Sequence, residues 1–111
     1  MRIIDTGITK EILSGDNHPQ LKIGDKLYTV DDRQKTWEKI QEVQEDKELS
    51  EKERTSKIYE LALGKEASKE IEDLDLPVSS TMHLSYCIIG AIIGEDPNLL
   101  EKQSKEQMRK N

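Results

Sequence analysis

The chain contains little of the material from which a large hydrophobic core is built. Its 111 residues include no Phe, one Trp and one Cys, and hydrophobic residues make up 33% of the total. A similar count that includes Gly is about 45–50% in globular proteins. One cysteine excludes an internal disulfide, and because Cys87 lies in an apolar segment we expect a reduced, cytoplasmic protein. The length predicts a single domain over residues 1–111, with a small core of Ile, Leu and Val.

Basic residues are fewer than acidic ones, 17 Lys and Arg against 23 Asp and Glu, and the net charge is −6. Nucleic acids and anionic membranes attract basic surfaces, so we expect neither as a partner. Residues 1–5 lack the apolar run of a signal peptide. The uncharged stretch Val78–Gly94 is shorter than the ~20 residues that span a bilayer. The remaining class of partner is another protein.

The sequence also lacks the combinations of residues that form metal sites and catalytic sites. His18 and His83 lie far apart, with no Cys or His at ligand spacing near either, so we predict no metal site. Cys87 has no basic neighbour in the sequence that would activate its thiol. The many carboxylates have Lys or Arg nearby, which is typical of a solvated surface and not of acid–base catalysis. We therefore predict no enzyme activity, no catalytic residues and no cofactor.

Residues 1–30 are predicted to be rich in β structure and turns. Residues 21–23 and 27–30 alternate between apolar and polar side chains on either side of Gly24-Asp25. This pattern predicts a β-hairpin.

From residue 31 onward the composition changes to helix-forming residues. We expect Asp31 or Asp32 to cap a helix that ends near Asp46. Ser50 and Glu53 form a capping box that opens a second helix. The residues expected to face inward are Trp37, Ile40 and Val43 in the first helix, and Ile58, Leu61 and Ala62 in the second.

Three further helices complete the predicted body. Gly64 is expected to stop the second helix in a left-handed conformation. A short helix then covers residues 65–74, with Ala67, Ile71 and Leu74 facing inward. Asp96 and Pro97 open a last helix that frays toward the end of the chain. The fold class is thus α+β: a two- or three-stranded N-terminal β element, followed by four or five helices packed around residues 79–93.

The uncharged segment Val78–Gly94 is the most informative part of the chain. Ser79 or Ser80 is expected to cap its helix, and Gly94 to close it. At about 100° per residue, the apolar side chains fall on two opposite sides, separated by a polar seam of His83 and Gly90. One side carries Leu84, Cys87, Ile88, Ala91 and Ile92; the other carries Met82, Tyr86, Ile89 and Ile93. A helix that is apolar nearly all round must be covered nearly all round.

The few apolar residues elsewhere look sufficient to cover one of these sides but not both. We therefore predict a protein-interaction face at Met82, Tyr86, Ile89 and Ile93, used for self-association or for a partner helix. Trp37 belongs either to the core or to this interaction surface as an anchor. The competing interpretation is that residues 1–30 fold over the second side and give a compact monomer.

Two passages of the chain carry a family resemblance. They are residues 27–32, Leu-Tyr-Thr-Val-Asp-Asp, and residues 58–67, Ile-Tyr-Glu-Leu-Ala-Leu-Gly-Lys-Glu-Ala. In this order of elements, over roughly residues 20–95, the chain resembles the small tail assembly chaperones of long-tailed bacteriophages of Gram-positive hosts. The resemblance implies a non-enzymatic protein that often self-associates. It would bind the tape measure protein during tail assembly, in the host cytoplasm, and be absent from the finished tail.

Two other interpretations of the sequence stay open. The chain could be a minor phage structural protein or an adaptor for host machinery, or another small acidic helical interaction module. The neighbouring genes distinguish these, because a tail assembly chaperone gene should lie just upstream of a very long, coiled-coil-like reading frame.

Overall fold

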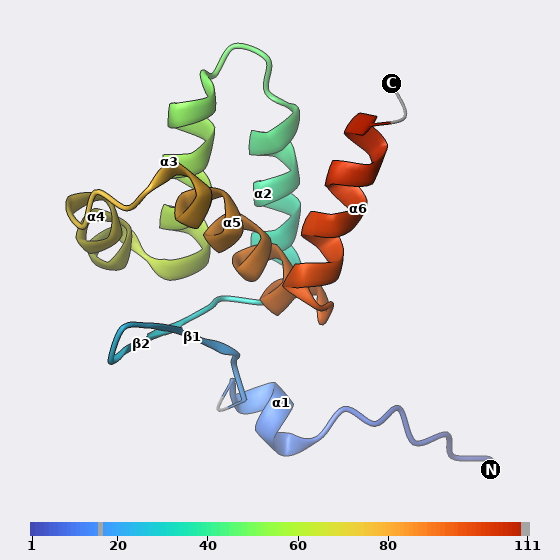
Figure 1. Cartoon of the computed structure of the whole chain (residues 1–111). Helices are drawn as coiled ribbons and strands as arrows, with labels where there is room; N and C mark the ends of the chain where they lie inside the picture. The colour runs from blue at the N-terminus through green and yellow to red at the C-terminus, as the bar shows by residue number, and fades with distance from the viewer. Residues whose placement is uncertain (16, 110–111) are drawn as a thin grey trace.

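The computed structural model describes residues 1–15 and 17–109, with side chains as far as residue 106. Its elements are α1 (Lys10–Ser14), β1 (Gln20–Ile23), β2 (Lys26–Thr29), α2 (Gln34–Glu45), α3 (Glu51–Leu63), α4 (Lys65–Asp73), α5 (Val78–Ile93) and α6 (Pro97–Arg109) (Figure 1). The predicted α+β class is confirmed: a two-stranded hairpin precedes a body of five helices within the described residues. The last helix continues to Arg109, and residues 110 and 111 lie outside the described residues.

The hairpin forms where the alternation predicted it. Its strands are antiparallel, with Leu21 opposite Tyr28 and Ile23 opposite Lys26. Gly24 takes the first turn position at φ 62°, a conformation that suits glycine. Tyr28 is buried, as is Val30 just after β2, so one face of the hairpin contributes to the core.

Helices α2 and α3 pack against each other. Their N-termini differ in how they are capped. The Ser50–Glu53 capping box at the start of α3 is confirmed. The expected cap of α2 is wrong: the helix begins after Arg33, which makes no side-chain cap bond. The Asp31 carboxylate instead accepts hydrogen bonds from the Arg33 guanidinium and the Thr36 hydroxyl, and Asp32 lies 2.6 Å from His18 Nδ1.

Other expected helix ends need correction. Gly64 has φ 94° and ψ 161°, which is outside the left-handed helical region, and the chain turns there directly into α4. Leu74 was expected to face inward but is 52% exposed, because α4 ends one residue before it. Neither Ser79 nor Ser80 caps α5, which starts at Val78 after Pro77. Gly94 does close α5 in the left-handed conformation, as predicted.

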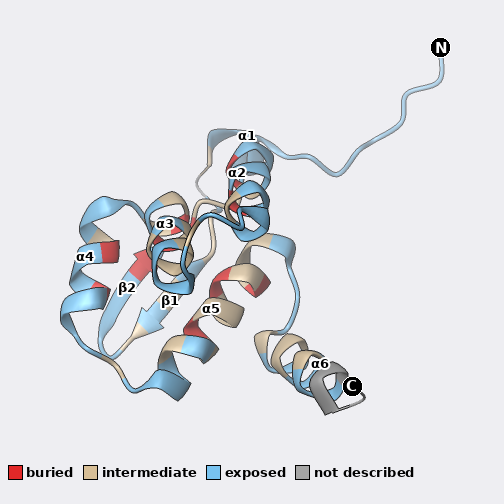
Figure 2. Cartoon of the chain, turned by 90° about the horizontal axis from the view of Figure 1, so that it is seen from above, coloured by how far each residue is buried: buried red, intermediate tan, exposed pale blue. Residues whose placement is uncertain are grey.

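The core is formed where the hairpin meets α2–α5. Its fully buried side chains are Val30, Ile40 and Ile88, one each from the chain after β2, from α2 and from α5. The other buried apolar residues are Tyr28, Tyr59, Ala62, Ile71 and Leu84. Figure 2 shows the buried segments, drawn in red, on β2 and on the inner sides of the helices.

The first fourteen residues, which we call the N-terminal arm, do not join this core. They were expected to be β structure and turns, but Lys10–Ser14 forms the short helix α1, whose first turn is capped by the Thr9 hydroxyl. Every residue of the arm is exposed. The arm runs away from the helical body in both views (Figures 1 and 2).

Candidate protein interface

The three sides of helix α5 lie in different environments, and the first side packs against α6. His83 Nδ1 lies 2.7 Å from Glu101 Oε2, and the Lys105 ammonium approaches the same carboxylate. These contacts hold the pKa of Glu101 below its ordinary value, the bond with His83 contributing most. At Gly90 the α5–α6 connection comes so close that an added Cβ would lie 2.6 Å from the Glu95 carbonyl oxygen. The predicted polar seam is therefore the line along which α6 packs.

The second side of α5 packs in the core. Leu84 and Ile88 are buried in it, and Cys87, Ala91 and Ile92 pack partly buried against it. Burial raises the pKa of the Cys87 thiol, with a smaller contribution from the Glu101 charge. A raised pKa leaves less of the reactive thiolate. This is the side that the sequence assigned to the core.

The third side of α5 is open. Val78, Met82 and Ile93 are exposed at 77%, 54% and 42%, and Tyr86 and Ile89 are half-buried. At about 100° per residue these five positions fall within an arc of about 80°. We call them the α5 stripe. Figure 1 shows α5 passing in front of α2 and α3, with α6 beside it.

Four of the five residues of the α5 stripe are the predicted interaction residues Met82, Tyr86, Ile89 and Ile93. The structure brings these four together, and their role in binding stays a prediction. Trp37 does not join them as an exposed anchor, since it is half-buried and packs against the core from α2. Val78 was missed because we assigned it to the chain before the helix. Its spacing of four residues from Met82 is the signal that could have found it.

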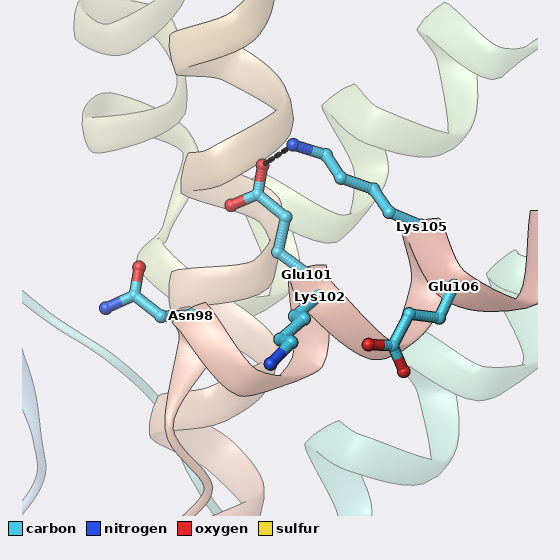
Figure 3. A pocket seen from close by; sticks show the side chains of 5 residues that line it. All are labelled: Asn98, Glu101, Lys102, Lys105 and Glu106. Atoms are coloured by element: carbon cyan, nitrogen blue, oxygen red, sulfur yellow. Dashed lines mark ion pairs between the residues drawn. The ribbon is translucent and has the colours of Figure 1, made fainter.

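Two hollows mark the surface near α5. One is an open hollow of about 350 Å³ on α6, lined by Asn98, Glu101, Lys102, Lys105 and Glu106 (Figure 3). All five side chains come from that one helix, which is typical of a solvated helix face. The other has a volume of about 510 Å³ and lies between β1 and α5. Its lining includes Ile23, Leu76, Leu84 and Cys87, so it is the more apolar of the two.

Charged groups elsewhere form isolated ion pairs. Lys26 Nζ lies 2.5 Å from Glu70 Oε2, a bond that raises the pKa of Lys26 and lowers that of Glu70. The Arg33 guanidinium, more than the Thr36 hydroxyl, holds the pKa of Asp31 far below its ordinary value. Among the described residues, no cluster of three or more His, Cys, Asp or Glu could hold a metal ion. Within the same residues no helix has the length and apolar character needed to cross a bilayer.

Comparisons with protein-family models, with curated proteins and with solved structures find no match to this chain.

Proposed function

We propose that the protein is a non-enzymatic binding protein of the tail assembly chaperone type, whose α5 stripe binds apolar helices of a long tape measure protein in the host cytoplasm. The α5 stripe carries this proposal. It offers a row of four aliphatic side chains and one tyrosine on a packed helix, and an amphipathic partner helix binds such a row through its own apolar face.

Two other properties support the same function. Fully burying an Ile or Met side chain contributes roughly 1.5–3 kcal/mol, so covering Met82 and Ile93 gives a partner a substantial gain. The net charge of −6 favours a partner with basic residues around its apolar face, and it opposes uncontrolled aggregation of a protein that exposes such a stripe.

The test is co-expression with the product of the long, coiled-coil-like reading frame that the proposal expects directly downstream of this chain's gene. Wild-type protein should keep that partner soluble and co-purify with it. The double variant Met82→Glu/Ile93→Glu should stay folded and bind roughly 10- to 100-fold more weakly, because two aliphatic side chains no longer enter the interface.

Leu27→Glu/Leu74→Glu is the matched control. These residues are as exposed as Met82 and Ile93 but lie on β2 and at the end of α4, so this variant should bind normally. Equal weakening by both pairs would show nonspecific stickiness, and no weakening by the first pair would remove the α5 stripe from the function.

A further inference from the structure

The molecule exposes more surface than a compact chain of its size. Its accessible surface is 8900 Å², whereas a compact 12.8 kDa monomer exposes about 6,300 Å². The radius of gyration is 15.9 Å, against about 13 Å for a compact domain of this length. The excess of about 2,600 Å² is larger than the roughly 800 Å² that each partner buries in an interface of standard size.

The N-terminal arm contributes to this excess, because all of its residues are exposed. Its five large aliphatic residues, Ile3, Ile4, Ile8, Ile12 and Leu13, are all more than half exposed. The hydrogen bonds described for residues 1–13 are local, such as Gly7 N–H to the Asp5 carboxylate and Ile12 N–H to the Thr9 hydroxyl. So apolar a segment gains free energy wherever it can be covered.

Among the described residues, no further strand pairs with the outer edge of β1, so the hairpin offers a backbone edge for such a segment. Val30 N–H donates to the Pro19 carbonyl, and hydrogen-bonded and non-hydrogen-bonded pairs alternate along an antiparallel ladder. The pairs Leu21–Tyr28 and Ile23–Lys26 are therefore hydrogen-bonded. It follows that the backbone groups of Gln20 and Lys22 point away from β2, where another strand can pair with them.

The apolar hollow between β1 and α5 includes Lys22 in its lining. Ile23, Leu76, Leu84 and Cys87 supply its apolar part, and Ser79, Ser80 and His83 supply polar groups. A strand edge that adjoins an apolar hollow is the arrangement that recognises an added strand: backbone bonds give affinity, and side chains in the hollow give specificity.

The chain's own arm is directed away from this edge. Just before β1, the chain is held by the 2.6 Å contact of His18 with Asp32 and by the bond between Pro19 and Val30. From there the arm runs outward (Figure 1). The hollow includes Lys22 and Ile23, toward the turn end of the hairpin, so an arm that entered its own hollow would have to reverse direction first.

We propose that the N-terminal arm of one copy docks on the β1 edge and the apolar hollow of a second copy, and that two copies exchange arms in a symmetric dimer. The segment around Ile3 and Ile4 adds as a strand beside β1, with an Ile side chain in the hollow. A two-fold axis repeats the contact, so one kind of interface covers both arms. This surface is separate from the α5 stripe, which stays free for the partner of the proposed function.

Sedimentation across about 1–300 µM protein tests the dimer. Wild-type protein should convert from monomer to dimer with rising concentration. Ile3→Asp/Ile4→Asp/Ile8→Asp should weaken dimerisation about 100-fold or more without lowering the unfolding temperature of dilute protein, because three aliphatic side chains leave the interface. Leu74→Asp, an exposed control outside the arm and the hollow, should dimerise like wild type. A wild type that is monomeric throughout, or an arm variant that still dimerises, would overturn the proposal.

The native Cys87 provides a direct probe of the docking site, since it lines the hollow. In Ile4→Cys protein treated with diamide, we expect a disulfide-linked dimer on a non-reducing gel. Lys57→Cys, on the outer side of α3, should give much less of it. An intramolecular link between residues 4 and 87 would show that the arm covers its own body, and absence of any link would exclude docking in the hollow. Met82→Glu/Ile93→Glu should dimerise normally, so a failure here is distinct from a failure at the α5 stripe.

Discussion

The helical body and the N-terminal arm contain the same aliphatic residue in opposite surroundings. In the body, Ile40, Ile71 and Ile88 are buried at 0–3% exposure. In the arm, Ile3 and Ile4 are exposed at 88% and 71%. These three isoleucines of the body lie on the sides of α2, α4 and α5 that form the core, whereas Ile3 and Ile4 precede the five-residue helix α1, and no described element covers them. Burial here depends on which elements are present to cover a side chain, and less on how apolar its own segment is.

The largest difference between the two regions should appear when one isoleucine in each is truncated. Ile88→Ala removes a fully buried side chain from the core and should lower the free energy of unfolding by about 2–5 kcal/mol. Ile3→Ala should change it by less than about 0.5 kcal/mol in dilute protein. Urea denaturation of both variants measures this. A comparable loss from Ile3→Ala at low concentration would mean that the arm packs on its own body.

The next largest difference in stability between body and arm should come from replacing one glycine in each. Gly90→Ala places a Cβ 2.6 Å from the Glu95 carbonyl oxygen, so the α5–α6 connection must shift, at a cost of about 1–3 kcal/mol. Gly7 has no atom within 4 Å of its ideal Cβ position, although its positive φ suits glycine. Gly7→Ala should strain only the arm and leave the thermal unfolding of the body unchanged. An unaffected Gly90→Ala protein would contradict the close packing of α6 on α5.

Removing a helix cap should also lower the unfolding free energy in the body but not in the arm, and the difference should be smaller than for the glycines. Ser50→Ala breaks the capping box of α3 and should cost about 1 kcal/mol. Thr9→Ala removes the cap of α1 but should leave the global unfolding free energy unchanged, because α1 lies outside the core. Chemical denaturation compares them, and equal losses would show that α1 unfolds together with the body.

The smallest effect concerns acid stability. The pKa of Asp31 is lowered in the folded protein, chiefly by Arg33. Its contribution to stability is therefore complete above the unfolded pKa of about 4 and is lost as the pH falls below that value. Asp31→Asn should reduce stability at pH 7 and flatten the decline between about pH 4 and pH 2.5. Thermal unfolding midpoints across this range measure it, and parallel curves for variant and wild type would contradict the assigned role.

The sequence predicted the features that depend on local chemistry. Alternation around Gly24-Asp25 identified the hairpin, and Ser50 with Glu53 identified the start of α3. Helical spacing also divided α5 into a buried side and a side on which Met82 and Ile93 are exposed.

The wrong predictions concern features that are determined by tertiary contacts and not by local sequence. Asp31 could not be known to bind Arg33 and Thr36 in place of capping α2. Tyr59 was not chosen for the core, although it is 3% exposed. Leu74 has helical spacing with Ile71, but α4 ends before it. The course of the arm and the hollow beside β1 depend on how separate elements pack, which periodicity does not encode.

On this view of the molecule, the body folds by itself, whereas the N-terminal arm is covered only when copies associate. Hydrogen–deuterium exchange read out by mass spectrometry tests it on one sample at about 1 µM and at about 300 µM. We predict that amides of residues 2–8 exchange at nearly unprotected rates in the dilute sample and become protected in the concentrated one. Amides of α3 and α5 should be protected in both. An arm that is equally protected at the two concentrations, or equally unprotected at both, would show that association of copies does not cover it.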